Sequence, residues 1–213
     1  MPVPTPPRPR QLIVEGKDDE HVILHLMMRH GYEWKKDSPV TPRIEAAGGL
    51  PQLIEQSSVA AKSCSRLGLV LDADDNLLGH WASLKNRLMD VNIALPAAPS
   101  KGGTIVDGFR NDWAVGVWLM PDNVLRGSIE HFLEDLVPSE DELWGYAKEA
   151  TQEAKARGAH LPPSDLLKGS LHAWLAWQEV PGRPYGTALT AEYFRHNTET
   201  ANAFVEWFNQ LFA

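Results

Sequence analysis

The stretch Leu67-Gly68-Leu69-Val70-Leu71-Asp72-Ala73-Asp74 decides the fold. Its first five residues carry no charge, which is the pattern of a strand that is buried on both faces of a sheet. Residues 114–120 form a second run of this kind. Sheets of this type are parallel and covered by helices on both sides, so the sequence predicts an α/β fold.

Strand-like and helix-like segments alternate through the first two thirds of the chain. Further strands are expected at 12–14, 43–47 and 104–106, and helices at about 18–31, 50–65 and 77–89. This alternation predicts a mostly parallel sheet with flanking helices.

The last third has a helical pattern, at 129–136, 140–157, 163–177 and 201–212. Residues 1–10 contain five prolines and are expected to form a flexible arm. We therefore expect an α/β core over 11–135 and a helical extension over 136–213 that packs on that core.

Composition limits the classes of function. The chain has 213 residues, of which 43% are hydrophobic and 23% charged, as in soluble globular proteins. No apolar run approaches the roughly 20 residues that cross a bilayer, and the start lacks the apolar segment of a secretion signal. The single cysteine, Cys64, suits a reducing compartment, so we expect a cytoplasmic protein. The net charge of −8 argues against a broad basic surface for nucleic acid, so a phosphate substrate would need a local patch or bound cations.

Acidic residues follow two of the expected strands. Glu15 comes directly after 12–14, and Asp72 and Asp74 come after 67–71. Because the carboxyl ends of parallel strands lie at one edge of the sheet, the three carboxylates converge if these strands are neighbours. Close carboxylates repel one another unless one is protonated or a divalent cation binds. Oxygen ligands favour Mg²⁺ or Mn²⁺.

Two more acids can reach the same edge. Asp19 lies one helical turn beyond Glu15, and Glu130 follows the strand at 114–120. Five carboxylates suffice for one or two metal ions. The alternative is that residues 72–76 form only a turn and a helix cap, a common use of Asp and Asn.

Two sets of residues resemble known families. Residues 12–19 (LIVEGKDD) and 69–74 (LVLDAD) resemble the Toprim domain that topoisomerases, bacterial primases and OLD-type nucleases share. Residues 117–123 (VWLMPDN) and 127–130 (GSIE) are similar to Toprim-like bacterial proteins of the DUF3226 type. The resemblance implies a Toprim-like, Rossmann-like sheet and Mg²⁺-dependent cleavage of phosphodiester bonds in DNA or RNA.

The resemblance also implies roles for residues. Glu15 would act in general acid/base chemistry, and Asp72 and Asp74 would hold Mg²⁺. By similarity to OLD-type nucleases, Asp19, Ser128 and Glu130 would complete a two-metal site. Lys168 would correspond to the C-terminal lysine that acts as a catalytic cation in those nucleases.

Two alternatives to an independent nuclease stay open. OLD proteins normally carry an ATPase part, and this chain has no Gly-x-x-x-x-Gly-Lys-Ser/Thr loop, so a separate ATPase partner is expected. The first alternative is a non-catalytic module that binds metal or nucleic acid and acts with such a partner. The second is a phosphotransfer protein that is modified on Asp72.

Weaker candidates have a plain structural interpretation beside the functional one. Lys17 and the pair Gly48-Gly49 are candidates for phosphate binding. The structural alternative is that Lys17 is an exposed lysine of a turn and that Gly48-Gly49 is a flexible entry to a helix. Lys168 can be an ordinary surface lysine. His21 and His25 have a zinc-binding spacing, but Val22 stands where an HExxH motif needs glutamate.

Tryptophans in the helical part are candidates for stacking on bases or for packing in the core or in a homodimer. They are Trp144, Trp174, Trp177 and Trp207.

Overall fold

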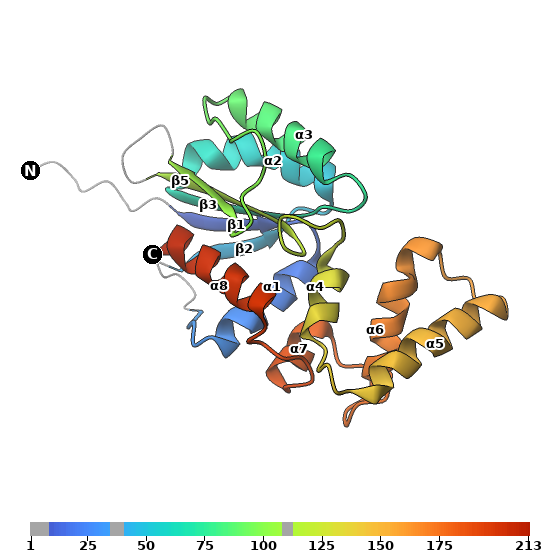
Figure 1. Cartoon of the computed structure of the whole chain (residues 1–213). Helices are drawn as coiled ribbons and strands as arrows, with labels where there is room; N and C mark the ends of the chain where they lie inside the picture. Colours follow the sequence, from blue (N-terminus) through green and yellow to red (C-terminus); the bar gives the residue numbers. More distant parts are fainter. Residues whose placement is uncertain (1–8, 35–40, 108–112) are drawn as a thin grey trace, which may run out of the picture.

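Five strands form the sheet at the centre of the computed structural model, which describes residues 9–34, 41–107 and 113–213 (Figure 1). The strands are β1 (Arg10–Val14), β2 (Arg43–Ala46), β3 (Arg66–Asp72), β4 (Thr104–Asp107) and β5 (Ala114–Met120). Their order is β2-β1-β3-β5-β4, and β4 runs antiparallel to β5 while the other pairs are parallel. The predicted α/β fold with a mostly parallel sheet is confirmed.

The helices follow the sequence pattern closely, with one addition. They are α1 (Lys17–Arg29), α2 (Leu50–Ser63), α3 (Leu77–Met89), α4 (Ile129–Leu136), α5 (Glu142–Ala156), α6 (Leu166–Ala176), α7 (Tyr185–Thr190) and α8 (Glu199–Phe212), with a 3₁₀ turn at Pro163–Asp165. The short helix α7 was not predicted. Most of the proline-rich arm lies outside the described residues, and β1 already begins at Arg10.

Helices cover both faces of the sheet. Figure 1 shows α2 and α3 on one face and α1, α4 and α8 on the other. Strand β1 serves both layers, because Ile13 packs toward α2 and α3 whereas Leu12 and Val14 pack toward α1 and α8. This two-sided burial explains why the central strands are apolar without interruption.

Two glycines let α8 lie close to the sheet. Gly68 of β3 and Gly116 of β5 are paired in register. A Cβ atom on Gly68 would lie 3.2 Å from Leu211 of α8, and one on Gly116 would lie 2.5 Å from it. The guanidinium of Arg10 also donates a hydrogen bond to the carbonyl of Phe212, which joins β1 to the end of α8.

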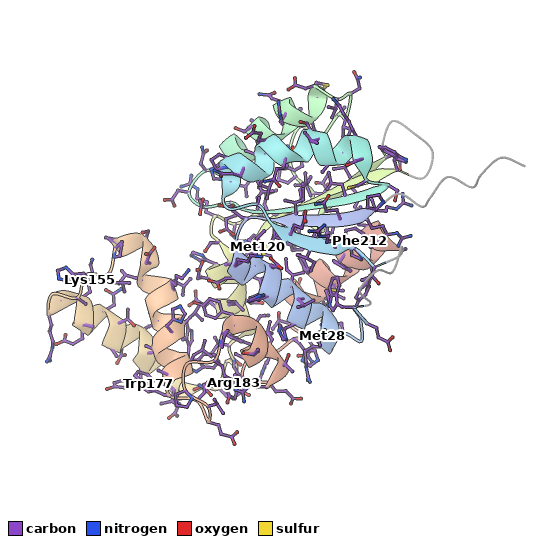
Figure 2. All side chains as sticks on the ribbon, turned by 180° about the vertical axis from the view of Figure 1, so that it is seen from behind. Met28, Met120, Lys155, Trp177, Arg183 and Phe212 are labelled. Carbon is purple, nitrogen blue, oxygen red and sulfur yellow. The ribbon has the colours of Figure 1, made fainter. Side chains whose placement is uncertain are left out.

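The remaining helices extend the layer that contains α1. Helix α7 packs against α1, and α5 packs against α6. Trp144, Trp174 and Trp207 are buried in the core, whereas Trp177 is 42% exposed and stacks on Tyr146. Figure 2 shows Trp177 at the far end of this helical part from the sheet. No helix within the described ranges is long and apolar enough to cross a membrane.

Candidate functional site

The strand order brings Glu15 and Asp72 together. Strands β1 and β3 are parallel neighbours with Val14 opposite Val70, so both acids lie at the carboxyl edge of the sheet. The backbone N–H of Asp72 donates to Oε2 of Glu15 over 3.2 Å. The sequence analysis expected the carboxylates to converge if these two strands were neighbours, and the strands are neighbours.

Glu15 lies between two backbone donors in a partly buried position. Burial raises the pKa of its carboxyl, and the negative charge of Asp74 adds to this increase. The N–H groups of Asp72 and of Leu50, the first residue of α2, act in the opposite direction. Glu15 is thus a carboxyl that holds a proton more readily than an exposed glutamate does.

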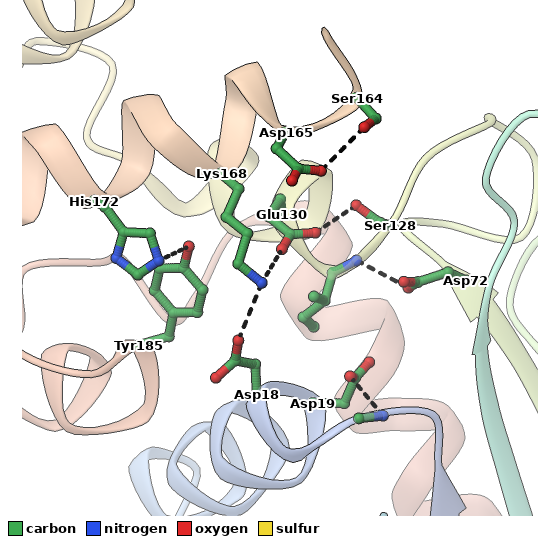
Figure 3. A network of polar contacts seen from close by, with 12 residues as sticks. Asp18, Asp19, Asp72, Ser128, Glu130, Ser164, Asp165, Lys168, His172 and Tyr185 are labelled. Atoms are coloured by element: carbon green, nitrogen blue, oxygen red, sulfur yellow. Dashed lines mark hydrogen bonds and ion pairs between the residues drawn. The ribbon is translucent and has the colours of Figure 1, made fainter. Parts of the chain in front are cut away.

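Asp72 is the most strongly perturbed acid of the group. Its Oδ1 accepts a hydrogen bond from the N–H of Ile129, 3.0 Å away, in the first turn of α4 (Figure 3). Burial and then the negative charges of neighbouring acids raise its pKa to about 9. These neighbours are Asp19, Glu15, Asp74 and Glu130. Without a cation, Asp72 is therefore protonated at neutral pH.

Asp19 is a buried acid with one unsatisfied oxygen. Its residue is 4% exposed, and its Oδ2 accepts the N–H of Gly16 over 3.0 Å. Its Oδ1 has no hydrogen-bond partner among the described residues. Burial, with the charges of Glu15 and Glu130, raises the pKa of Asp19 to about 7. A buried polar atom without a partner is rare and is typical of a ligand-binding position.

Glu130 and Asp74 complete the acidic cluster, which we define as Glu15, Asp19, Asp72, Asp74 and Glu130. The hydroxyl of Ser128 donates to Oε2 of Glu130 over 2.6 Å. Asp74 and Gly127 exchange two backbone hydrogen bonds, of 2.7 and 3.0 Å. This bridge fixes the loop after β3 against the loop that enters α4.

Lys168 of α6 faces the acidic cluster from the helical extension. Its Nζ lies 3.4 Å from Oε1 of Glu130 and 3.5 Å from Oδ2 of Asp18 (Figure 3). Burial alone would lower the pKa of Lys168, but the two carboxylates outweigh burial and raise it. The fold thus brings Lys168, the predicted catalytic lysine, beside Glu130, although the two residues are far apart in the sequence.

The carboxylates are close enough to repel one another but do not enclose a common point. Within the part of the chain that the structure describes, no three His, Cys, Asp or Glu side chains form a ready-made metal cage. Four members of the cluster form no ion pair with a lysine or arginine among the described residues. They are Glu15, Asp19, Asp72 and Asp74.

The three candidates for phosphate binding have other partners. The N–H groups of Gly48 and Gly49 both donate to the backbone carbonyl of Glu15, at 3.1 and 3.0 Å, so neither is free for a phosphate. The two glycines instead fix the backbone of Glu15 at the entry to α2. Lys17 is exposed and pairs with Glu20 one helical turn on, over 2.6 Å. This geometry agrees with the interpretation of Lys17 as a turn lysine.

Comparison with protein families accounts for almost the whole chain. A model described as "Protein of unknown function (DUF3226)" matches residues 9–213. The chain belongs to this family. The predicted resemblance to DUF3226 is therefore confirmed, and membership extends over the helical part as well as the sheet. Searches of curated proteins and of solved structures gave no match to this DUF3226 chain.

Three residues at the site were not predicted as site residues. In this DUF3226 chain, Asp18 pairs with Lys168, and the buried ring of Tyr185 stacks on His172 with centroids 5.1 Å apart. The Tyr185 hydroxyl lies 3.3 Å from Nε2 of His172. Burial, and then the charges of Glu130 and Asp18, raise the pKa of Tyr185. The one available signal was the spacing of Lys168 and His172, four apart on one helical face.

Proposed function

We propose that this chain is a divalent-cation-dependent enzyme that cleaves phosphodiester bonds in DNA or RNA and has a Toprim-type acidic site. One observation carries the proposal. Acids that follow β1, begin α1 and α4, and end β3 lie so close together that burial and mutual repulsion raise the pKa of Asp72 to about 9. A fold that keeps uncompensated carboxylates together loses stability, so we infer that they bind a cation.

The donor set fits Mg²⁺ or Mn²⁺. The cluster offers carboxylate oxygens, the hard ligands that these ions prefer. Oδ1 of Asp19, buried without a hydrogen bond among the described residues, is the atom that most needs a positively charged partner. We assign Asp19, Asp72, Asp74 and Glu130 as ligands, with Ser128 orienting Glu130 through its hydroxyl.

The bound cation would place positive charge beside the scissile phosphate and make a nearby water molecule more acidic. Glu15 would accept or return a proton at Oε2, because burial keeps its pKa above that of an exposed glutamate. Lys168, whose Nζ lies beside Oε1 of Glu130, would offer its ammonium to the phosphate. Tyr185 and His172 would form the wall beside Lys168.

The decisive experiment compares cleavage by the wild type and by Asp72→Asn. The amide keeps an oxygen for the N–H of Ile129 but removes the charge. We expect the wild type to cleave single- or double-stranded DNA or RNA with Mn²⁺ or Mg²⁺, and Asp72→Asn to lose at least 100-fold in rate. The control, Asp90→Asn, changes a 65% exposed aspartate at the end of α3 and should retain full activity. Cleavage that persists in EDTA, or in Asp72→Asn, would reject the proposal.

A second candidate is a metal- or nucleic-acid-binding module that acts with a separate partner such as an ATPase. The exposed pair Tyr146 and Trp177, 59% and 42% exposed, favours it because large apolar side chains on a surface often mark a protein contact. Metal binding without turnover, restored to activity by a co-purifying partner, would support this candidate. Beryllofluoride bound at Asp72 would instead support phosphotransfer, the third candidate.

A further inference from the structure

A pocket of about 290 Å³ lies along the segment that joins β5 to α4. Its lining comes from the loop after β5, from α4 and from the start of α8. Pro121 and Leu125 supply apolar surface, and Arg126, His131 and Asp135 supply polar groups. This volume is at the small end of ligand sites and suits a group of about the size of a nucleobase or nucleoside.

Two charged side chains in this pocket have no partner among the described residues. Neither Arg126 nor Asp135 makes an ion pair or a side-chain hydrogen bond with any residue that the structure describes. The other acids of the lining are already engaged. Glu134 pairs with Lys148 over 3.2 Å, and Oδ1 of Asp122 accepts two backbone N–H groups of its own turn. The pocket therefore presents one free guanidinium and one free carboxylate that do not satisfy each other.

A third polar group of the pocket has a defined tautomer. Nδ1 of His131 accepts the N–H of Ser128 over 3.1 Å, so the proton of the neutral ring is on Nε2. His131 thus adds a hydrogen-bond donor to the pocket.

The pocket shares a segment with the acidic cluster. The hydroxyl of Ser128 contacts Nδ1 of His131 at 3.3 Å and also donates to Glu130. Gly127, next to Arg126, is bonded to the backbone of Asp74. A ligand held by Arg126 and His131 therefore lies next to a chain segment that carries Glu130 and is hydrogen-bonded to the backbone of Asp74.

We propose that this pocket binds a guanine base of the substrate, next to the phosphate that is cleaved, through Arg126 and Asp135. The inference rests on the proposed function and adds the base that the site selects. Guanine offers O6 and N7 as acceptors to an arginine and N1–H and an amino group as donors to a carboxylate. Adenine and cytosine lack one half of this match. A bare phosphate is disfavoured, because the lining holds three carboxylates and one guanidinium.

Calorimetric titration with nucleoside 5′-monophosphates in EDTA tests the inference on the full chain. We expect GMP to bind at least tenfold more tightly than AMP, CMP or UMP. Arg126→Gln and Asp135→Asn should each weaken GMP binding at least tenfold, as the loss of a bidentate base contact does. Arg157→Gln and Asp90→Asn, at exposed positions outside the pocket, are matched controls and should bind GMP as the wild type does. Arg126 and Asp135 are exposed, so neither substitution should change the melting temperature. A melting temperature equal to that of the wild type will show that each variant is folded.

The outcomes separate this inference from the proposed function. Titrations are made in EDTA, so Asp72→Asn should bind GMP normally while it fails to cleave. Equal affinity for all four nucleotides, no binding of GMP, or displacement of GMP by an equal concentration of inorganic phosphate would overturn the guanine pocket and leave the cleavage proposal standing. GMP selectivity without any cleavage would reject only the enzyme. If both hold, cleavage of oligonucleotides should occur next to guanine, and Arg126→Gln should lose that preference.

Discussion

Replacement of Asp72 by a side chain that cannot ionise should stabilise the cation-free protein at alkaline pH. The pKa of Asp72 is about 9 in the fold, against 3.8 as the usual value. A carboxyl whose pKa is raised by folding contributes its full stability below the unfolded value. This contribution is lost as the pH rises toward the folded value. In EDTA, the free energy of unfolding of the wild type should therefore fall between pH 5 and pH 8.

The magnitude follows from one retained proton. Each pH unit in this window removes at most about 1.4 kcal/mol, which gives an upper limit of about 4 kcal/mol from pH 5 to pH 8. Asp72 is partly exposed and shares its repulsion with Asp19 and Glu15, so we expect about half of this, roughly 2 kcal/mol. Asp72→Asn is neutral at every pH and keeps an acceptor for Ile129. It should exceed the stability of the wild type by an amount that grows by roughly 2 kcal/mol from pH 5 to pH 8.

Urea denaturation in EDTA at pH 5, 6, 7 and 8, followed by circular dichroism, measures the difference. Asp90→Asn, which removes an exposed carboxylate outside the cluster, should follow the wild type at every pH. Parallel curves for the wild type and Asp72→Asn would refute the reasoning, and so would a wild type that gains stability from pH 5 to pH 8. Either result would mean that the acids are not held together against their repulsion.

Three other perturbations follow from the same structure. Saturating Mg²⁺ or Mn²⁺ at pH 8 should raise the melting temperature of the wild type by about 5 °C or more and leave that of Asp72→Asn unchanged, as scanning fluorimetry would show. Lys168→Met removes the ammonium that bridges two carboxylates, so the Mn²⁺ affinity measured by calorimetry should rise several-fold, with less than about 1 kcal/mol change in stability. Lys62→Met, at the exposed end of α2, is its control, and a weaker affinity in Lys168→Met would contradict the expectation. Gly68→Ala places a Cβ 2.4 Å from a leucine of β1 and should cost about 1–3 kcal/mol in urea denaturation. Gly145→Ala, in the first turn of α5 with nothing within 4 Å of the added Cβ, should instead add up to about 1 kcal/mol. An equal loss in both variants would show that packing on β3 is not the cause.

The sheet could be predicted because its central strands are buried on both faces. Residues 67–71 and 114–120 read as apolar runs, and the structure places them in β3 and β5. The direction of β4 could not be predicted, since four residues carry no signal of their neighbour's orientation. Helix α7 was missed because its six residues are too few for a periodic pattern and include Gly186.

The site could be predicted only where its chemistry lies at strand ends. Glu15 and Asp72 follow strands directly, so their approach depends on one fact of topology, the pairing of β1 with β3. Asp18 had no such signal, because an acid in the first turn of a helix is commonplace. Its partner Lys168 lies 150 residues away on α6, which packs against α4 and α5, so only the tertiary structure brings the pair together. The sequence left two interpretations of Gly48-Gly49 open, because a phosphate-binding loop and a tight helix entry can have the same local sequence.

The close seat of α8 on Gly68 and Gly116 also constrains synthesis of the protein. The cover that α8 gives to β3 and β5 is encoded after every other helix and strand of the sheet layer, so Val70 and Trp118 lack that cover while the ribosome makes the residues between. Until α8 emerges, α1 and α4 can cover only part of that face of the nascent sheet, and the part that α8 covers stays exposed. We expect the growing chain to depend on chaperones at that stage, and truncation before Leu211 to give aggregated rather than merely weakened protein.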